Sequence, residues 1–282
     1  MPNNAEALHR CYNEFYMQNG PYIADRRMPH IVQDICARRG IAYAAFSDDW
    51  VLRLERGDAL RWVIGYKFDV NSSAAGELAQ DKVATYMALH AAGVPAIEHY
   101  LVRSLPHDPL EGHFEHDDLR GPVVVKPLNG TGGRLVERYE SAGEALQAVR
   151  GSEEPAWAIS PHYDLAAEYR LVMLDGKLLL ALEKTQPTLR GELKLFNLGY
   201  GAVAADVTDE AVLGELTAAA QQVMRAMGLR LAAVDIVRTA GGGLKVLEVN
   251  DGITLEHYLR QSTEYENRAV NVYDAVVAAM FA

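Results

Sequence analysis

The chain has 282 residues, of which 49% are hydrophobic and 23% charged, with 27 Lys and Arg against 38 Asp and Glu. This composition excludes a disordered, collagen-like or disulfide-rich chain. The net charge of −11 argues against a partner bound through a nucleic-acid backbone. No apolar run approaches the length of about 18 residues that a membrane span needs, and the N-terminus does not resemble a signal peptide. The lone thiols Cys11 and Cys36 have no disulfide or zinc spacing. We therefore expect a cytoplasmic protein without a membrane partner.

The predicted elements of the first third begin with helices and continue with short strands. Gly and Pro mark their ends, and Asn71-Ser72-Ser73 provides the cap of a long helix that ends at Gly93-Val94-Pro95. In chain order we predict helices at about 5–18 and 29–39, strands at about 41–46, 50–55 and 60–65, and a helix at about 71–92.

The remaining two thirds alternate between β and α patterns. An Asp175-Gly176 dipeptide predicts a hairpin turn. In chain order we predict strands at about 98–103, 122–127 and 135–139, a helix at 141–150, strands at 156–163, 169–174 and 178–183, a helix at 209–227, strands at 231–238 and 244–249, and a helix at 264–280.

Two stretches lack such a pattern. Residues 107–120 are rich in His, Asp and Glu and are predicted to form a solvated loop rather than a metal site, and residues 185–207 are predicted as a long connection. The whole reads as an α+β chain in three parts, with boundaries near 96 and 158. The three parts are an N-terminal subdomain (1–96), a subdomain with a glycine-rich loop (97–158) and a C-terminal subdomain (159–282).

The segment 231–250, LAAVDIVRTAGGGLKVLEVN, carries the strongest chemical signal. A two-residue turn at Gly241-Gly242 would place Asp235 opposite Glu248, and strand alternation adds Asn250 to the same face. Two carboxylates and an amide oxygen suit Mg²⁺, which binds nucleotide phosphates. Two alternatives stay open: a solvated hairpin with aligned charges, and a shift of the register by the third glycine.

A second segment, GPVVVKPLNGTGGR at 121–134, places Lys126 at the end of an apolar run and a glycine-rich loop directly after it. Backbone N–H groups of such a loop and a lysine charge can hold phosphate. A glycine hairpin with a solvated lysine is an equally good interpretation. In a third segment, the hairpin places Arg170 and Lys184 beside the acidic cluster, with a surface ion pair as the alternative.

Together, these segments resemble the ATP-grasp superfamily, and most closely its RimK-type amino-acid and peptide ligases. The resemblance covers roughly 70–260. It rests on the order of seven segments: Asp81-Lys82, the strand 123–126 with its glycine loop, Ile159-Ser160-Pro161, Glu168-Tyr169-Arg170, Asn197-Leu198-Gly199, Val234-Asp235-Ile236 and Leu247-Glu248-Val249-Asn250.

The resemblance implies an ATP-grasp fold in three subdomains, with ATP between a small lid and a C-terminal antiparallel sheet. It also implies roles for particular residues. Lys82, Lys126, Gly130, Thr131, Gly132 and Gly133 would hold the phosphates, and Ser160, Pro161, His162, Tyr163 and Asp164 would hold the adenosine. Asp235, Glu248 and Asn250 would bind Mg²⁺ (or Mn²⁺), and Arg170, Lys184 and Asn197 would line the γ-phosphate and acyl side.

The sequence also departs from the family pattern. The hinge lacks the usual Glu for the ribose, for which Asp164 is the candidate, and the loop after Asn250 lacks the Ser and Pro-Gly step. The first 70 residues lack an opening strand with a glycine turn.

The implied reaction is the ATP-dependent joining of a small carboxylic acid to an amine through an acyl phosphate. An amino acid or peptide is the expected substrate. A kinase of the same fold and a non-catalytic ATP-binding regulator are the alternatives, and a homodimer stays open. The segments expected to contact the substrate contain Arg190, Lys194, Tyr200, Thr254, His257 and Tyr258, and the first two favour an anionic substrate.

Overall fold

The protein is described by a computed structural model that covers residues 25–103, 119–130, 132–150 and 152–282. The predicted helix at 5–18, the larger part of the His-rich loop 107–120, and Thr131 lie outside these residues. In chain order the elements are α2 (Met28–Arg39), β1 (Ala42–Phe46), β2 (Val51–Arg56), β3 (Ala59–Ile64), β4 (Lys67–Phe68), α3 (Ser73–Gln80), α4 (Lys82–Ala91), β5 (Tyr100–Arg103), β6 (Val123–Pro127), β7 (Glu137–Tyr139), α5 (Ala142–Val149), β8 (Ala156–Pro161), β9 (Leu165–Leu174), β10 (Lys177–Thr185), β11 (Thr188–Arg190), β12 (Leu193–Leu195), η3 (Leu198–Tyr200), β13 (Val203–Asp206), α6 (Glu210–Met227), β14 (Leu231–Thr239), β15 (Leu244–Asn250), α7 (Glu256–Leu259) and α8 (Thr263–Met280).

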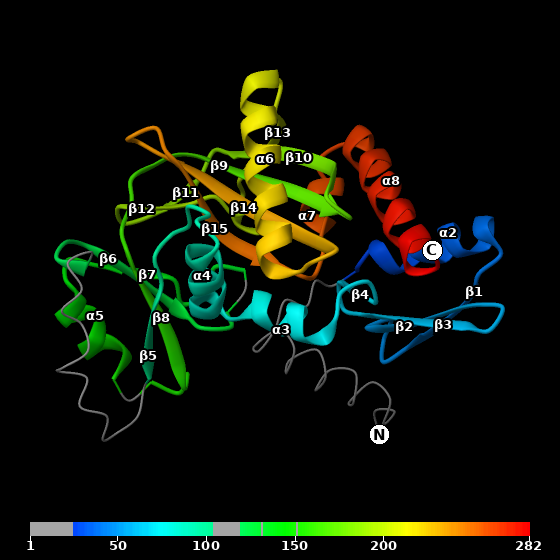
Figure 1. Ribbon diagram of the computed structural model, residues 1–282, viewed down its shortest axis with the longest axis horizontal. Coiled ribbons are helices and arrows are strands. Elements are labelled where there is room, and N and C mark those ends of the chain that lie inside the picture. The colour runs from blue at the N-terminus through cyan, green and yellow to red at the C-terminus, as the bar shows by residue number, and fades with distance from the viewer. Residues whose placement is uncertain (1–24, 104–118, 131, 151) are drawn as a thin grey trace, which may run out of the picture.

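A five-stranded antiparallel sheet forms the centre of the molecule, in the order β13-β10-β9-β14-β15. Both of its faces are covered, so its middle strands are almost continuously apolar. Along β14, Val234 and Ile236 pack in the core beneath α3, α4 and α6, whereas Leu231 and Ala233 pack in the core toward α2 and α8. Figure 1 shows α6 crossing one face of this sheet. The site described below lies among the strands of this buried sheet.

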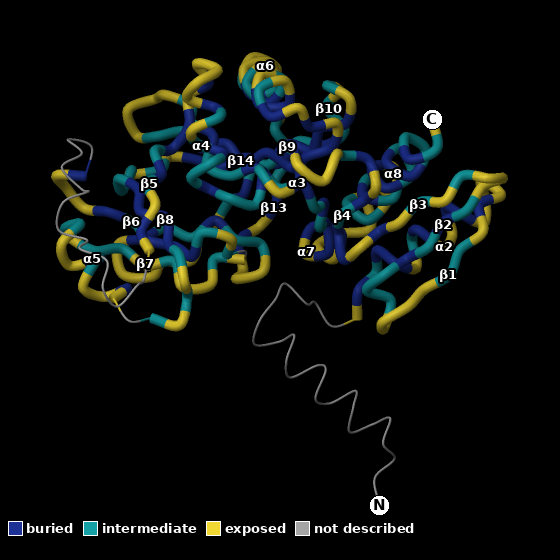
Figure 2. Tube along the Cα trace, turned by 60° about the horizontal axis from the view of Figure 1, so that its bottom comes forward, coloured by how far each residue is buried: buried dark blue, intermediate teal, exposed yellow. Residues whose placement is uncertain are grey.

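A smaller sheet lies on each side of the central one (Figure 1). The lid sheet has the order β5-β8-β6-β7 and packs against α5 through a separate core that includes Val125, Ala145 and Ile159. The N-terminal sheet is the meander β1-β2-β3-β4, and Leu52 and Leu54 of β2 join the core with α2 and α8. Figure 2 shows buried segments along the central sheet and exposed chain along much of β1 and β3.

The predicted helix at 71–92 is wrong in one respect, because the structure divides it at Asp81. Ser72 caps α3 by accepting a hydrogen bond from the Ala75 N–H (3.2 Å). Asp81 is extended and caps α4 through bonds from the N–H groups of Val83 and Ala84 (2.9 and 2.8 Å). An Asp favours a helix start over a helix interior. The break places Lys82 at the first position of α4.

The connection predicted for 185–207 contains the hairpin β11–β12, the turn η3 and strand β13. The short elements β4 and α7 also went unpredicted. The boundary predicted near 158 falls inside β8, which belongs wholly to the lid sheet. Within the described part of the chain, no helix has the length and apolar character needed to cross a membrane.

Candidate active site

A cleft of about 590 Å³ lies between the central sheet, the lid sheet and the N-terminal sheet. Strands β9, β10, β14 and β15 form its floor, the hinge and the glycine-rich loop form one wall, and the chain around Trp50 and Tyr66 forms the far end. All the described residues to which the sequence assigned site roles line this cleft, except for Asp164 at the edge of the hinge. Segments far apart in the sequence therefore meet at one site.

Arg170, Asp235 and Glu248 form one row across the cleft floor, since each stands opposite the next on β9, β14 and β15. The Arg170 guanidinium donates two hydrogen bonds to Asp235, Nε to Oδ1 at 2.8 Å and Nη2 to Oδ2 at 2.7 Å. Burial raises the pKa of Asp235, but the charges of Arg170 and Lys184 outweigh it and lower the pKa to about 2. Asp235 is therefore an ionised carboxylate held by cations.

The alignment of Asp235 with Glu248 was predicted correctly, although the turn was not. The loop has three residues between Thr239 and Gly243, with Gly242 at φ 91°, so the register near the turn is shifted by one. An irregularity between Asp235 and Ile236 leaves Leu247 unpaired and restores the predicted register. The bulge compensates for the third glycine.

Lys184 and Glu168 form a second buried pair beside this row. They stand opposite each other on β10 and β9, with Nζ 2.5 Å from Oε1. Lys184 also lies 3.1 Å from Asp235 Oδ1. Burial raises the pKa of Glu168, and Lys184 opposes this shift. Arg170 and Lys184 thus flank the acidic centre as predicted, but they form a buried network rather than a surface ion pair.

The residues present fit a hard divalent cation such as Mg²⁺ in part. Glu248 and Asn250 line the cleft, and the Glu248 side chain is 27% exposed. Their oxygens are the donor type that Mg²⁺ prefers. Both oxygens of Asp235 already accept bonds from Arg170. Among the described residues no group of three His, Cys, Asp or Glu side chains is placed to hold a metal, so a cation here would depend on Asn250, water and the nucleotide phosphates as well.

Two lysines stand where phosphate is expected. Lys82 donates to the carbonyl oxygens of Leu128 (3.1 Å) and Gly130 (2.6 Å), and its Nζ lies 3.9 Å from Glu248 Oε1. Lys126, at the end of β6, is 9% exposed. Burial lowers its pKa to about 8, with Glu248 opposing this shift and Lys82 adding to it. Two buried ammonium groups close together are a site prepared for an anion.

The glycine-rich loop is held against the central part of the molecule. Gly132 and Gly133 have φ of 68° and 75°, which other residues rarely adopt. The Asn197 amide donates to the Gly132 carbonyl at 2.9 Å, and a Cβ on Gly133 would lie 3.4 Å from the Tyr200 ring. Asn197, predicted to line the γ-phosphate side, thus fixes the loop that covers the cleft.

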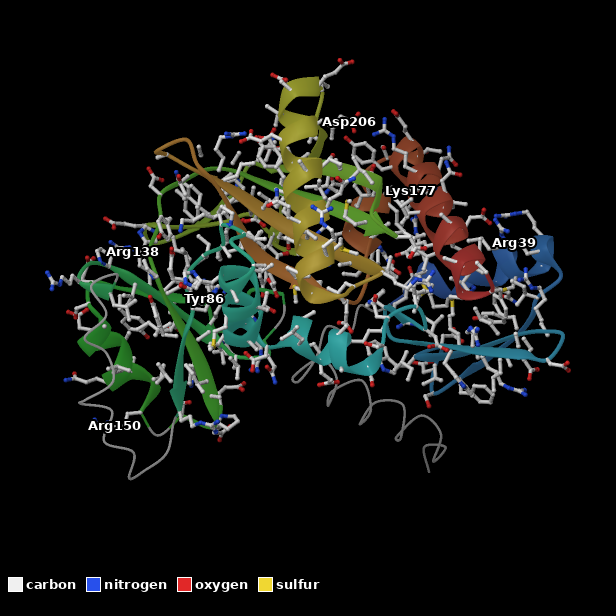
Figure 3. All side chains as sticks on the ribbon, in the orientation of Figure 1. Arg39, Tyr86, Arg138, Arg150, Lys177 and Asp206 are labelled. Carbon is white, nitrogen blue, oxygen red and sulfur yellow. The ribbon has the colours of Figure 1, made fainter. Side chains whose placement is uncertain are left out.

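The hairpin β11–β12 makes further contacts with the lid. Arg138 on β7, labelled in Figure 3, pairs with Glu192 at 2.9 Å. Arg190 donates to the Val136 carbonyl at 3.0 Å, and Lys194 donates to Asp164 Oδ1 at 2.7 Å. These partners engage Arg190 and Lys194, the two cations that favoured an anionic substrate in the sequence, with the lid and the hinge.

The hinge from Ser160 to Asp164 is ordered by several bonds. Ser160 Oγ donates to the Val124 carbonyl at 3.4 Å, the His162 N–H donates to the Pro122 carbonyl at 2.9 Å, and the Tyr163 hydroxyl donates to Glu98 at 2.7 Å. Apolar side chains including Val124, Leu195, Leu247 and Val249 line the adjoining cleft. A flat apolar slot with backbone polar groups at its edge suits a nucleobase.

Sequence reasoning missed three contacts in the loop after Asn250. Asp251 Oδ2 lies 2.9 Å from Lys67 Nζ, across from the N-terminal sheet. Glu256 is fully buried and accepts hydrogen bonds from the N–H groups of Arg27 and Met28 (3.0 and 2.9 Å) at the start of α2. These partners are more than 180 residues away in sequence, so only a carboxylate in an otherwise apolar stretch hinted at them.

Fold and site define the class: a central antiparallel sheet, a small lid sheet, and between them two lysines, a glycine loop and a carboxylate row are the features of an ATP-grasp protein. Residues 123–279 match a family described as an ATP-grasp domain, the third family of its clade, and this covers more than half of the chain. The chain belongs to this family. The resemblance drawn from the sequence is thereby confirmed.

Several curated proteins are similar to part of the chain. A probable alpha-L-glutamate ligase of Aeromonas salmonicida is 31% identical over 202 residues, which is 66% of this chain and 61% of that protein. A cyanophycin synthetase of Trichormus variabilis is 30% identical over 155 residues, which is 52% of this chain and 16% of that much longer protein. The chain therefore spans less than two thirds of these relatives.

Solved structures support the fold. A D-alanine–D-alanine ligase of Bacillus anthracis complexed with ATP superposes with a TM-score of 0.55 at 19% identity, covering 75% of this chain and 69% of that one. The ATP-grasp ligase PsnB complexed with a minimal precursor gives a TM-score of 0.51 at 17% identity, covering 74% and 64%. The predicted ATP-grasp fold is confirmed.

Proposed function

We propose that the protein is an ATP-dependent carboxylate–amine ligase that forms an amide bond through an acyl phosphate and releases ADP and phosphate. The observation that carries this proposal is the row Arg170–Asp235–Glu248, which faces the two buried lysines and the glycine loop across one cleft. The similarity to glutamate ligases and to a cyanophycin synthetase supports it.

The chain's own residues bind and orient the reactants. Lys82 and Lys126 hold the nucleotide phosphates, and the loop fixed by Asn197 covers them and excludes water, which would hydrolyse an acyl phosphate. Glu248, Asn250 and one oxygen of Asp235 would hold Mg²⁺, which supplies charge neutralisation on the phosphates. Arg170 and Lys184 stabilise negative charge on the transferred phosphoryl group.

We further propose that both substrates are small, an amino acid or a peptide supplying at least one of them. The end of the cleft away from the hinge is lined by Trp50, Ile64 and Tyr66. Lys67, the described cation nearest this end, is paired with Asp251. This end therefore offers apolar contact more than free positive charge, in contrast to the anionic substrate that Arg190 and Lys194 suggested in the sequence.

The test measures ADP release from Mg-ATP with pooled amino acids and small carboxylic acids, with and without hydroxylamine, which traps acyl phosphates as hydroxamates. We expect ADP release that depends on a carboxylic acid and yields hydroxamate. The matched variant Glu248→Gln should abolish both. A stable phosphorylated product without hydroxamate would identify a kinase instead, and ATP binding without turnover on any pool would contradict the ligase.

A further inference from the structure

The substrate half of the cleft contains one titratable base that no described charge partner engages. His257, on α7, lines the cleft and is exposed to it. No described residue is hydrogen-bonded to its imidazole. Its Nε2 faces η3, because a Cβ on Gly199 would lie 3.0 Å from His257 Nε2 and 3.1 Å from Asn197 Oδ1. His257 is thus a neighbour of the residue that fixes the glycine loop over the phosphates.

The described carboxylates that line the cleft are all committed elsewhere. Glu168 is bound to Lys184, and Asp235 to Arg170. Glu248 lies near Lys82 in the row assigned to the cation, and Asp251 is bound to Lys67. None of them is available as a neutral-pH proton acceptor without breaking an ion pair.

The other described histidine that lines the cleft is at the wrong end. His162 belongs to the hinge, where its N–H donates to the Pro122 carbonyl and where the nucleobase slot lies. By elimination among the described residues, His257 is the base available to a second substrate that reaches the phosphate end from the N-terminal side.

We propose that His257 accepts the proton of the attacking amine in the second half-reaction. This proposal rests on the proposed ligase function. The amine nitrogen forms a bond to the acyl carbon, the bond from that carbon to the phosphate oxygen breaks, and phosphate leaves with the electron pair. The proton lost by the nitrogen passes to His257 Nε2 and is later released to solvent.

The surroundings of His257 suit this role. Burial lowers its pKa below the ordinary 6.5, Arg260 lowers it further and Glu256 opposes the shift. Both charged neighbours belong to α7 or directly follow it, and η3, the element in contact with Nε2, contributes only the phenol of Tyr200. The imidazole is therefore neutral at pH 7 and able to take up a proton.

The experiment compares two acceptors on one acyl phosphate. Hydroxylamine is uncharged at neutral pH, whereas an α-amino group has an ordinary pKa of about 8 and is mostly protonated there. In His257→Gln, amide formation with the amine substrate should fall by about 100-fold or more, the usual contribution of a general base. Hydroxamate formation from the same acid should stay unchanged. The exposed His30 on α2 provides the control His30→Ala, in which both products should be unchanged.

A pH profile gives the second readout. With the amine substrate, the His257→Gln rate should rise with pH toward that of the wild type, as more acceptor becomes uncharged without help. Equal amide formation by the variant and the wild type at pH 7 would overturn the proposal, and so would parallel loss of amide and hydroxamate. Absence of hydroxamate from the wild type itself would refute the ligase function instead.

Discussion

Asp235→Asn tests whether the centre of the site is held by charge. Asp235 is 3% exposed and accepts three contacts from cations, two from Arg170 and one from Lys184 at 3.1 Å. Asn keeps the shape but removes the charge and replaces one acceptor by a donor. Removing one partner of a buried ion pair costs about 3–5 kcal/mol. Because Lys184 retains Glu168, we expect the lower end, about 3 kcal/mol.

The assay is calorimetric unfolding of the ligand-free protein at pH 7. At about 2–4 °C per kcal/mol for a chain of this size, the Tm should fall by roughly 6–12 °C. The pKa of Asp235 is depressed from 3.8 to about 2 in the folded state. Its charge therefore stabilises the fold fully above about pH 4, and this stabilisation is lost as the pH falls through about 2. The Tm difference between variant and wild type should shrink in that window.

Glu248→Gln is the matched control. Its carboxylate is 27% exposed, and its one described ion pair is the 3.9 Å approach to Lys82, so its loss should leave the Tm nearly unchanged while turnover is lost. An unchanged Tm in Asp235→Asn would refute the view that Asp235 neutralises two buried cations. An equal loss of Tm in both variants would show that the row acts as one structural unit.

Three further predictions follow from the site. Lys126, whose pKa burial lowers to about 8, should lose its charge at high pH, so calorimetric affinity for a non-hydrolysable ATP analogue should fall between about pH 7 and pH 9 in the wild type but not in Lys126→Arg. Glu256→Gln should lower the unfolding free energy by about 1–3 kcal/mol in denaturant titrations, because an amide cannot accept both N–H bonds at the start of α2; an unchanged midpoint would contradict this. Asn197→Ala should raise the KM for ATP several-fold with little change in Tm, since its bond to Gly132 holds the loop and not the core; an unchanged KM would remove Asn197 from this role.

Local rules account for the parts of the site that were predictable. Strand alternation and a hairpin turn brought Asp235 and Glu248 together from the sequence, and the error of one residue in the turn was cancelled by the bulge at Leu247. The cap at Asp81 was also readable, because an Asp followed by a helical run is a start signal. The apolar continuity of 71–92 concealed it.

The remaining contacts depend on tertiary structure. Nothing near Glu256 indicates that it caps a helix more than 220 residues earlier in the chain, and nothing near Asp251 indicates Lys67. Both contacts connect the loop after Asn250 to the N-terminal part. They explain why this loop departs from the family pattern of Ser followed by Pro-Gly: here the loop carries carboxylates that hold the N-terminal part in place, and it positions α7 with His257 beside the cleft.

The charges around the row explain why a ligand-free site of this kind is prepared for a polyanion. Lys82, Lys126, Arg170 and Lys184 face three carboxylates, Glu168, Asp235 and Glu248, so four positive charges meet three negative ones in a largely buried space. The imbalance is greatest at Lys126, for which no described ion pair exists and whose pKa falls to about 8. A bound polyphosphate would remove this imbalance and raise that pKa, and nucleotide binding near pH 8 should therefore be accompanied by proton uptake. The same cations that weaken the ligand-free site thus become its source of affinity, whereas Asp235, already neutralised by Arg170, contributes mainly to keeping them in place.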